Sequence, residues 1–563
     1  MREEYLRWCK EAPHSPYADK EVLMALSQMK ENEEEIEDAF YRTLAFGTGG
    51  LRGVLGAGDN RMNVYTVAKA TQGLADYVNN TVQKSRKSIA ISYDSRIKSE
   101  LFARVTASVL AANGIRAHIY PHLAPTPALS FAVRALGAEA GVMITASHNP
   151  SHYNGYKVYG SDGCQITDAA AKCILSHIEK TDIFHGVRYL PFSEGLKSGD
   201  IRYIDASVEE AYLSSVLEQS LAEGASSDKS IPIVYTPLNG TGLTFVLRAL
   251  ARAGFTSVTT VKEQTEPNGD FPTCPYPNPE IKEALTLGLR DARARGAEIL
   301  LATDPDCDRV GVAVRNEKGE YEVLSGNEVG VLLLDYICRR REALEKMPKC
   351  PTCIKTVVTT DIAEHVALSY GVHVENVLTG FKYIGEKIGE MEKRGEKENF
   401  LFGFEESCGY LAGSYVRDKD GVLGALLVCE MTAYYRAQGE SLTERLDALY
   451  AKHGYAKNTL YSYELPGKEG AEKIRQIMER IRKETECIGS LRVVSVKDYL
   501  CGIDGLPPAN AVKLFLEGRS TVTVRPSGTE PKAKLYLSVI AQTKEEAEKR
   551  EGQIKNEMAR IFC

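Results

Sequence analysis

A β-rich segment, Gly141–Thr145, passes directly into a polar loop in the sequence Gly141-Val142-Met143-Ile144-Thr145-Ala146-Ser147-His148-Asn149-Pro150. Two β-rich segments precede it, at Ser88–Tyr93 and Arg116–Tyr120, and helical windows at residues 99–113 and 127–137 separate the three. This alternation predicts a parallel α/β sheet. Because ligand loops of open α/β sheets follow the carboxyl ends of strands, Ser147 is predicted to lie where chemistry is usually found.

The same alternation restarts twice downstream, and the last part of the chain changes character. The β-rich segments are Ile231–Tyr235 and Ala297–Thr303 in the second unit, Cys353–Thr359, His373–Val377 and Asn399–Phe404 in the third, and Val512–Leu516, Thr521–Arg525 and Lys534–Ile540 in the last, which ends in a charged helix at Lys544–Ile561. We therefore predict three successive α/β domains with mixed or parallel sheets and a smaller C-terminal α+β domain. The predicted boundaries are 1–195, 196–320, 321–450 and 451–563.

The composition indicates a multidomain protein that binds neither nucleic acid nor a membrane. Its 563 residues exceed what one hydrophobic core organises, and 69 basic residues against 76 acidic ones give a net charge of −7. Met1–Leu6 lacks the apolar core of a signal peptide, and the longest apolar runs, 329–334 and 422–429, are too short to cross a bilayer. The 13 scattered cysteines indicate reduced thiols, so a soluble cytoplasmic protein is expected.

Three carboxylates stand at alternate positions in Asp304-Pro305-Asp306-Cys307-Asp308-Arg309. Like charges about 4 Å apart repel by about 4 kcal/mol at an effective dielectric near 20, so three packed carboxylates need a cation or must stay apart. Oxygen ligands select a hard ion, and Mg²⁺ is the expected one. An EF-hand is excluded because Arg309 and Arg315 stand where glycine and glutamate are required. A solvated acidic turn is the alternative.

A second loop, Arg525-Pro526-Ser527-Gly528-Thr529-Glu530-Pro531-Lys532, has the chemistry of an anion site. Arginine offers a bidentate fork, the hydroxyls donate hydrogen bonds, and glycine lets backbone N–H groups approach an oxyanion. A plain turn is the alternative here, as it is for the loop around Ser147.

The chain contains two further segments of interest, Thr379-Gly380-Phe381-Lys382 and Phe404-Glu405-Glu406-Ser407. Together with the serine, aspartate and arginine loops described above, they resemble the α-D-phosphohexomutase superfamily of phosphoglucomutases and phosphomannomutases. The resemblance implies four domains around a central active-site cleft. It also implies that Ser147 carries a phosphoryl group and binds Mg²⁺ together with Asp304, Asp306 and Asp308.

The resemblance implies functions for further residues, and for Arg52, Lys157 and Arg309 no local pattern distinguishes them from ordinary surface charges. The implied functions are charge stabilisation or proton transfer by Arg52, Lys157 and Arg309, shaping of the serine loop or proton transfer by His148, sugar recognition by Thr379, Gly380, Lys382, Glu405 and Ser407, and phosphate binding by Arg525, Ser527, Gly528 and Thr529.

The preferred sugar is inferred from a departure within the resemblance. The mannose and glucosamine branches usually have Glu-x-Ser-Gly-His, whereas this chain has Glu405-Glu406-Ser407-Cys408-Gly409. Asp418-Lys419-Asp420-Gly421 also resembles the long-chain branch of phosphoglucomutases and phosphopentomutases. The expected reaction interconverts glucose 1-phosphate and glucose 6-phosphate through glucose 1,6-bisphosphate. The alternatives are a pentose or mannose phosphate substrate, or a sugar-phosphate binding or regulatory protein without activity.

Overall fold

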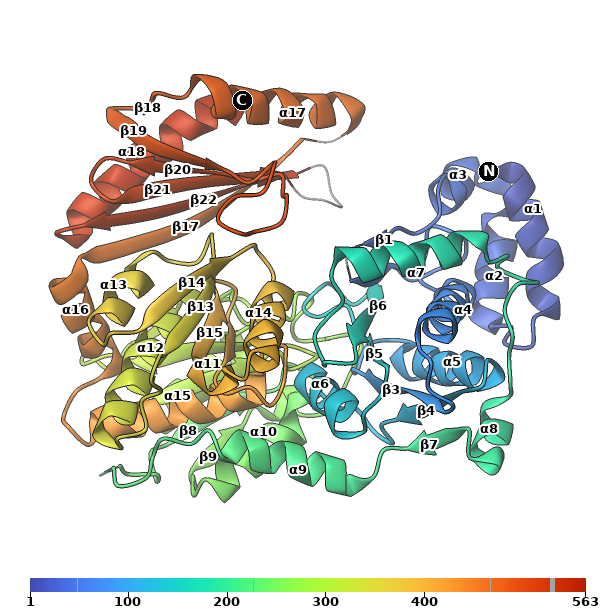
Figure 1. Ribbon diagram of the computed structural model, residues 1–563, viewed down its shortest axis with the longest axis horizontal. Coiled ribbons are helices and arrows are strands. Elements are labelled where there is room, and N and C mark those ends of the chain that lie inside the picture. The colour runs from blue at the N-terminus through green and yellow to red at the C-terminus, as the bar shows by residue number, and fades with distance from the viewer. Residues whose placement is uncertain (48, 226, 466, 527–531, 563) are drawn as a thin grey trace.

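In the computed structural model, residues 1–47, 49–225, 227–465, 467–526 and 532–562 are described. Within these ranges the strands form four sheets that succeed one another along the chain. Figure 1 shows the first sheet on the right, the second and third packed together on the left, and the C-terminal sheet above them. Each of the first three sheets mixes parallel and antiparallel pairs, and the fourth is antiparallel. The predicted fold class is confirmed.

The first sheet brings the loop containing Ser147 next to two antiparallel strands. Its order is β1-β2-β6-β5-β3-β4-β7, and the serine loop follows β5. Lys157 of β6 pairs with Gly50 of β2, and Gly155 pairs with Arg52, so both cationic candidates lie beside the serine loop. The bounds are β1 Phe46–Gly47, β2 Gly50–Val54, β3 Lys87–Tyr93, β4 Ile115–Ile119, β5 Ala140–Ile144, β6 Tyr153–Gly160, β7 Ile201–Tyr203, α1 Arg2–Glu11, α2 Lys20–Gln28, α3 Glu33–Phe40, α4 Val64–Thr81, α5 Ser99–Ala112, α6 Thr126–Ala135, α7 Asp168–Lys180 and α8 Phe192–Ser198.

The second sheet, in the order β12-β11-β10-β8-β9, carries the aspartate loop between two of its central strands. β10 ends at Thr303 and β11 begins at Val310, and the two strands pair antiparallel. Every residue of β10 is buried, which matches its uninterrupted apolar sequence. The bounds are β8 Ile233–Thr236, β9 Val258–Thr260, β10 Ile299–Thr303, β11 Val310–Arg315, β12 Tyr321–Leu324, α9 Ala206–Leu217, α10 Gly242–Arg252 and α11 Thr286–Arg295.

The third sheet places Glu405 at the end of a buried strand. Its order is β14-β13-β15-β16, with β13 parallel to both β14 and β15. α12 begins with a capping box in which Ser325 and Glu328 satisfy each other's backbone N–H groups. The bounds are β13 Thr352–Thr356, β14 His373–Val377, β15 Phe400–Glu405, β16 Gly409–Leu411, α12 Gly326–Ala343, α13 Ile362–Leu368, α14 Phe381–Lys393, α15 Gly421–Arg436 and α16 Leu442–His453.

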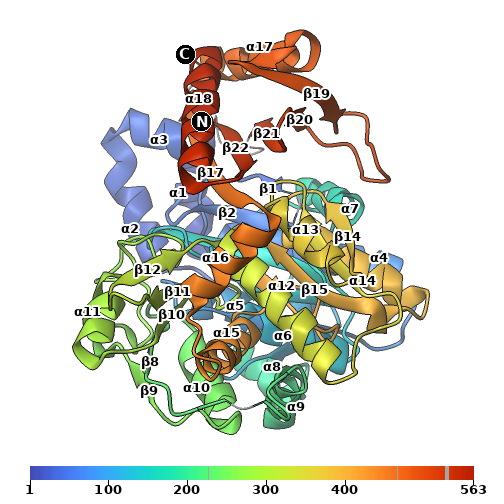
Figure 2. The ribbon, with the colours of Figure 1, turned by 90° about the vertical axis from the view of Figure 1, so that its left-hand side faces the viewer.

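The C-terminal sheet is antiparallel, in the order β17-β22-β21-β20-β19-β18. The long strand β17 leads into it from α16, and α17 and α18 lie along its outer side (Figure 2). The bounds are β17 Tyr455–Glu464, β18 Cys487–Ile488, β19 Leu491–Asp498, β20 Val512–Leu516, β21 Ser520–Pro526, β22 Lys532–Ala541, α17 Gly467–Glu484 and α18 Lys544–Phe562. The four domain boundaries stay predictions, although β7 extends the first sheet past residue 195.

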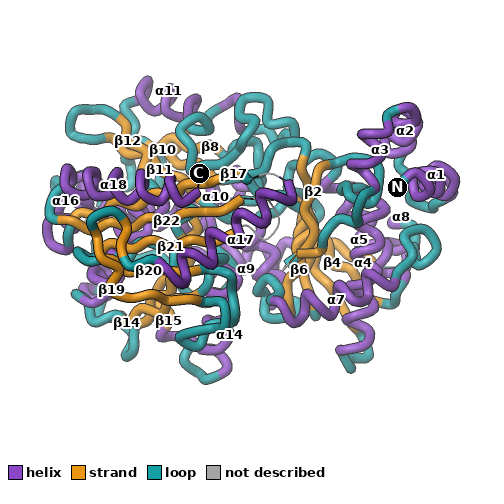
Figure 3. The backbone as a smooth tube through the Cα atoms, turned by 90° about the horizontal axis from the view of Figure 1, so that it is seen from above, coloured by secondary structure: helices purple, strands orange, loops and turns teal. Residues whose placement is uncertain are grey.

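One continuous hydrophobic core extends through the first three modules and reaches Ala456 of β17 and Ile540 of β22, and the C-terminal module has a further core of its own. The shared core includes Met143 of β5, Phe245 of α10 and Leu426 of α15. The C-terminal core is formed by residues such as Val522 and Ile554. Seen from above, the C-terminal sheet lies over the second and third modules and beside the first (Figure 3). Within the described residues, no helix is long and apolar enough to cross a membrane.

Buried charges join the C-terminal sheet to the third module. The carboxylate of Asp361 lies 2.8 Å from Lys513 Nζ of β20 and 3.3 Å from Lys355 Nζ of β13, and it accepts a hydrogen bond of 2.9 Å from the Thr521 hydroxyl. Burial raises the pKa of Asp361, but the two ammonium groups outweigh burial and hold it well below its usual range. Asp361, Lys513 and Thr521 line one side of a cavity of about 770 Å³ between the two modules.

Replacing Asp361 by asparagine should therefore destabilise the protein by about 3 kcal/mol, because Lys355 and Lys513 lose a shared counter-charge in a buried site. The loss should be largest at neutral pH and shrink as the pH falls below about 4, since a carboxylate with a depressed pKa stabilises the fold above its unfolded pKa. Asp504→Asn is the matched control, because Asp504 pairs with the half-exposed Lys497 of neighbouring β19 at 2.7 Å. Equal thermal midpoints for the two variants would contradict the prediction.

Candidate active site

Ser147 lies in a strained turn that aims its hydroxyl at the aspartate loop. Its φ is 53°, in the left-handed region, and its side chain is buried. The backbone N–H donates to Thr145 Oγ1 at 2.8 Å, and the Ser147 hydroxyl donates to Asp304 Oδ2 at 2.8 Å. Such conformations cost about 1–3 kcal/mol and persist where the surroundings enforce them. The structure thus brings together two groups separated by 157 residues of sequence.

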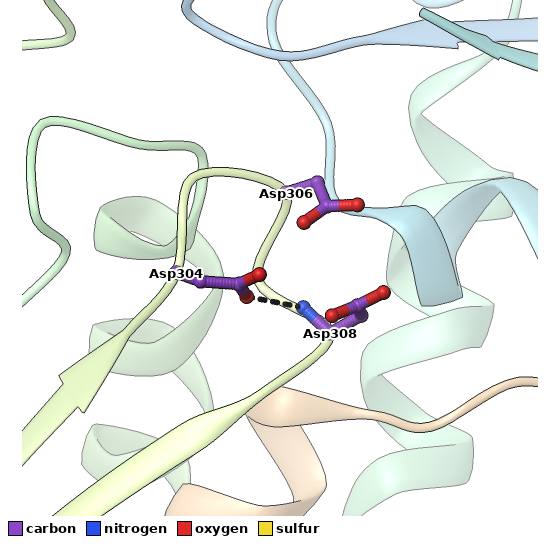
Figure 4. Close-up of side chains that lie close together, drawn as sticks. All are labelled: Asp304, Asp306 and Asp308. Carbon is purple, nitrogen blue, oxygen red and sulfur yellow. Dashed lines mark hydrogen bonds between the residues drawn. The ribbon is translucent and has the colours of Figure 1, made fainter. Parts of the chain in front are cut away.

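The three aspartates turn their carboxylates toward one another, as Figure 4 shows. One oxygen from each of Asp304, Asp306 and Asp308 lies within 4.8 Å of the other two, and all three residues are buried. Asp304 Oδ1 accepts hydrogen bonds of 3.1 Å from the backbone N–H groups of Asp308 and Arg309, which curl the loop around it. The alternate spacing predicted from the sequence therefore produces one convergent cluster.

Two lysines from other modules contact this cluster. Lys157 of β6 lies 2.8 Å from Asp306 and 3.7 Å from Asp308. Lys419, from the segment before α15, lies 2.8 Å from Asp308 Oδ2. Burial lowers the pKa of Lys157, but Asp306 and Asp308 outweigh burial and raise it, so Lys157 keeps its proton.

The two lysines pair with Asp306 and Asp308 and, within the described residues, leave the charge of Asp304 without an ammonium partner. Burial, followed by the charges of Asp306 and Asp308, raises the pKa of Asp304 well above its ordinary value. Asp306 Oδ1 is buried without a hydrogen-bond partner. A buried, unpartnered oxygen within a set of hard oxygen donors fits a divalent cation such as Mg²⁺. The alternative of a solvated acidic turn is excluded by the burial of all three aspartates.

Lys419 should compete with a cation held by the three aspartates, because its ammonium group already contacts Asp308 Oδ2. Lys419→Met should consequently tighten Mg²⁺ binding by about tenfold, since it removes a repelling charge next to the site. The measurement is the Mg²⁺ concentration that half-saturates the rise in thermal midpoint. Lys382→Met is the control, because Lys382 contacts Asp168 at 3.4 Å instead of the cluster. Unchanged or weaker Mg²⁺ binding by the Lys419 variant would show that the two do not compete.

The remaining candidate cations lie around the serine loop. Arg52 is exposed on β2 and donates to Asn149 Oδ1 at 3.5 Å. Arg309 pairs with Glu280 at 2.7 Å. His148 Nδ1 lies 3.3 Å from Ser147 Oγ, and burial together with the charges of Arg309 and Arg52 lowers the pKa of His148 well below its ordinary value. His148 is therefore neutral at pH 7.

The predicted sugar motif follows β15 and faces the same region. Burial raises the pKa of Glu405 to about 7, although Lys419 and Arg309 oppose the shift. The carboxylate of Glu406 accepts hydrogen bonds of 3.2 Å from Thr356 and Thr359, so the middle residue of the motif is used within its own module. Ser407 is partly buried in the turn between β15 and β16.

Thr379 and Gly380 precede α14, and Lys382 lies in its first turn. Gly380 has a φ of 117°, a conformation that a side chain would strain. Cys164 Sγ of the first module donates to the Lys382 carbonyl at 3.2 Å, so this segment is fixed across the boundary between two modules. In the C-terminal module, Arg525 is partly buried on β21. The predicted phosphate-binding residues Ser527, Gly528 and Thr529 lie outside the described residues.

Comparisons with known proteins identify the family. Three family descriptions match in chain order: phosphoglucomutase/phosphomannomutase α/β/α domain I at residues 43–183, domain II at 210–319 and domain III at 325–453. The chain belongs to the phosphoglucomutase/phosphomannomutase family. The predicted superfamily is thereby confirmed.

Members of the phosphoglucomutase/phosphomannomutase family align along most of the chain. The phosphoglucomutase of Staphylococcus saprophyticus is 37% identical over 528 residues, covering 92% of this chain and 94% of that protein. A phosphoglucomutase of Staphylococcus aureus is 35% identical over 524 residues, covering 90% and 92%. Two crystal structures share the fold. A putative phosphomannomutase from Thermus thermophilus is 23% identical, and the match covers 92% of this chain and 99% of that chain with a TM-score of 0.69. The open form of the Paramecium phosphoprotein parafusin is 17% identical, and the match covers 92% of this chain and 96% of that chain with a TM-score of 0.72.

Two further residues of this phosphoglucomutase/phosphomannomutase family member are functional candidates that the sequence alone does not identify. In the sequence, Lys419 stands out only as part of a branch motif, and Arg96 in Asp94-Ser95-Arg96 belongs to no distinguishing pattern. Lys419 contacts the aspartate cluster, and Arg96 contacts the serine loop. A lone basic residue is usually a solvated surface charge, so neither had a local signal that could have identified it.

Proposed function

We propose that the protein is a phosphoglucomutase that interconverts glucose 1-phosphate and glucose 6-phosphate through a phosphorylated Ser147 and glucose 1,6-bisphosphate. The observation that carries the proposal is the 2.8 Å hydrogen bond from the Ser147 hydroxyl to Asp304, which sets a nucleophile against a carboxylate cluster. The choice of glucose is supported by relatives named phosphoglucomutase that are 37% and 35% identical.

Each transfer exchanges one phosphorus–oxygen bond for another. The bond between Ser147 Oγ and phosphorus breaks, a bond from phosphorus to the free sugar hydroxyl forms, and the hydroxyl proton passes to a base. His148, 3.3 Å from Ser147 Oγ, is the candidate for that base. Lys157 keeps its proton and would instead act as a proton donor or stabilise charge. The reverse transfer from the other phosphate of the bisphosphate then restores phosphorylated Ser147.

The charges around the cluster suit this chemistry. Lys157, Arg309 and Arg52 would stabilise the negative charge on the transferring phosphoryl group. Such electrostatic stabilisation supplies most of the rate enhancement in phosphoryl-transfer sites. Asp304, Asp306 and Asp308 would hold Mg²⁺, with the phosphoserine as a further ligand. When bound, the ion supplies charge neutralisation for the transferring phosphoryl group.

The rest of the substrate would be held by groups from the third and C-terminal modules. Glu405 and Ser407 would bind sugar hydroxyls, and Thr379, Gly380 and Lys382 would distinguish the two orientations of the sugar. Arg525, Ser527, Gly528 and Thr529 would bind the phosphate that is not reacting. Acidic and hydroxyl side chains match the fixed pattern of donors and acceptors on a sugar.

The decisive experiment compares turnover of glucose 1-phosphate, ribose 1-phosphate and mannose 1-phosphate by the purified protein, with Mg²⁺ and a trace of the matching bisphosphate. Glucose 1-phosphate should give the highest kcat/KM. Faster turnover of ribose or mannose phosphate would overturn the assignment of the sugar. If no substrate turned over and Ser147 took up no phosphate from a bisphosphosugar, the protein would be a binding protein.

A further inference from the structure

Arg96 collects the backbone of the serine loop around one guanidinium group. It lies in the loop after β3 and is buried. One of its terminal nitrogens donates to the carbonyl oxygens of Pro150 at 2.8 Å and Tyr153 at 3.0 Å. The other donates to the carbonyl of Ser147 at 2.6 Å and to that of Asn149. Four carbonyl oxygens from one loop thus converge on a single side chain.

This convergence explains how Ser147 stays in its strained conformation. Turning four carbonyl dipoles toward one point in a buried site is costly unless donors satisfy them, because a buried acceptor without a donor loses its hydrogen bond to water and gains nothing in return. A planar guanidinium supplies several donors in a fixed fork, whereas a lysine ammonium supplies three donors at one point. Arginine is therefore the side chain that can hold this loop with Ser147 at a φ of 53°.

The guanidinium is itself fixed from two directions. Asp94, also buried, lies 3.5 Å from Arg96 Nε and provides the counter-charge. On the other side, the Arg96 guanidinium lies over the ring of Phe271, 5.1 Å from its centroid. Phe271 belongs to the second module, which also carries the aspartate loop.

The backbones of the two modules touch at this point as well. A Cβ atom at Gly269 would lie 2.4 Å from the backbone nitrogen of Ile97 and 2.8 Å from the Arg96 carbonyl carbon, so the close approach requires glycine. Arg96 consequently links the loop that carries Ser147 to the module that carries Asp304.

We propose that Arg96 is a positioning residue for phosphoryl transfer, which sets the distance and direction of Ser147 Oγ relative to the aspartate cluster. This inference rests on the proposed function, because it assumes that Ser147 is the group that is phosphorylated. Arg96 donates only to backbone carbonyls in this loop and therefore acts through Ser147. A misplacement of about 1 Å between reacting groups can cost about 100-fold in rate.

The test compares Arg96→Lys with Arg340→Lys. Arg340 is also buried and donates to backbone carbonyls, those of Leu221 at 2.9 Å and Glu223 at 2.5 Å, but it lies on α12 away from the site. Arg96→Lys should lower kcat for glucose 1-phosphate about 100-fold with KM changed less than about threefold, because a misplaced nucleophile affects the transfer step. The rate of phosphate incorporation into Ser147 should fall by the same factor. Arg340→Lys should change neither quantity, even if it lowers the thermal midpoint equally.

Two outcomes separate this inference from the proposed function. If wild-type Ser147 takes up no phosphate from glucose 1,6-bisphosphate, the proposed function fails. If wild-type Ser147 is labelled and Arg96→Lys is labelled at the same rate, the positioning inference alone fails. If Arg96→Lys does not fold, Phe271→Leu is the second test, because it keeps an apolar side chain and removes the ring on which the Arg96 guanidinium lies. A wild-type kcat in Phe271→Leu would then overturn the inference.

Discussion

Ser147→Ala should lower turnover of glucose 1-phosphate by about 10⁴-fold or more, because the variant has no oxygen to carry the transferred phosphoryl group. Sugar-phosphate binding should remain measurable, since the proposed binding residues of the third and C-terminal modules are unchanged. Kinetics in the presence of glucose 1,6-bisphosphate would give the first quantity, and titration calorimetry with glucose 6-phosphate the second.

The matched control for this variant is Ser151→Ala, a second serine in the same loop that lies beyond Pro150 and is partly buried. It should keep turnover near the wild-type value. The hydroxyl of Ser147 donates to the Asp304 carboxylate and lies 3.3 Å from His148 Nδ1, so its loss should cost about 2 kcal/mol of stability. Unfolding would therefore not explain a loss of turnover in Ser147→Ala. Full activity of Ser147→Ala would refute the assignment of the phosphorylated residue.

Removal of divalent cations by a chelator should lower turnover by about 1,000-fold, and added Mg²⁺ should restore it. The expected size follows from the several kcal/mol that a metal ion contributes at a transferring phosphoryl group, at tenfold per 1.36 kcal/mol. Chelation should also lower the thermal midpoint, because three buried carboxylates are left with Lys157 and Lys419 as their counter-charges.

Asp306→Asn gives an independent check of the same site. The variant keeps the volume of the side chain but removes the charge and one hard ligand, so Mg²⁺ should no longer raise its thermal midpoint. Asp504→Asn, in the C-terminal module, should retain the full response to Mg²⁺. A chelator-treated protein that kept its turnover, or an Asp306 variant that kept the response to Mg²⁺, would contradict the metal assignment.

Most of the secondary structure followed from local patterns. The strands at His373–Val377 and Val512–Leu516 have the predicted bounds, and the strand before Ser147 differs by one residue at each end. The strand before Ser147 was predictable because a continuous apolar run between turn residues indicates a buried strand without reference to its partners. The predicted helix at residues 99–113 likewise corresponds to α5, Ser99–Ala112.

The aspartate cluster was also predictable, because its three carboxylates lie within a stretch of five residues and need no long-range contact to be recognised. Arg96 and Lys419 were not. Each is a single basic residue whose importance depends on what lies opposite it in the fold, and the partners of Arg96 include Phe271 in another module. Asp361 belongs to the same class, since Lys513 is 152 residues away from it in the sequence.

The sequence by itself determined the order of strands and loops, the family resemblance and the convergent spacing of the three aspartates, because each of these is a property of neighbouring residues. The tertiary structure alone decided which charges face the cluster, how the Ser147 backbone is held at a φ of 53°, and how the C-terminal sheet is joined to the third module. The physical reason is that burial and charge pairing act between atoms that chain folding brings together, and a linear pattern does not contain those distances.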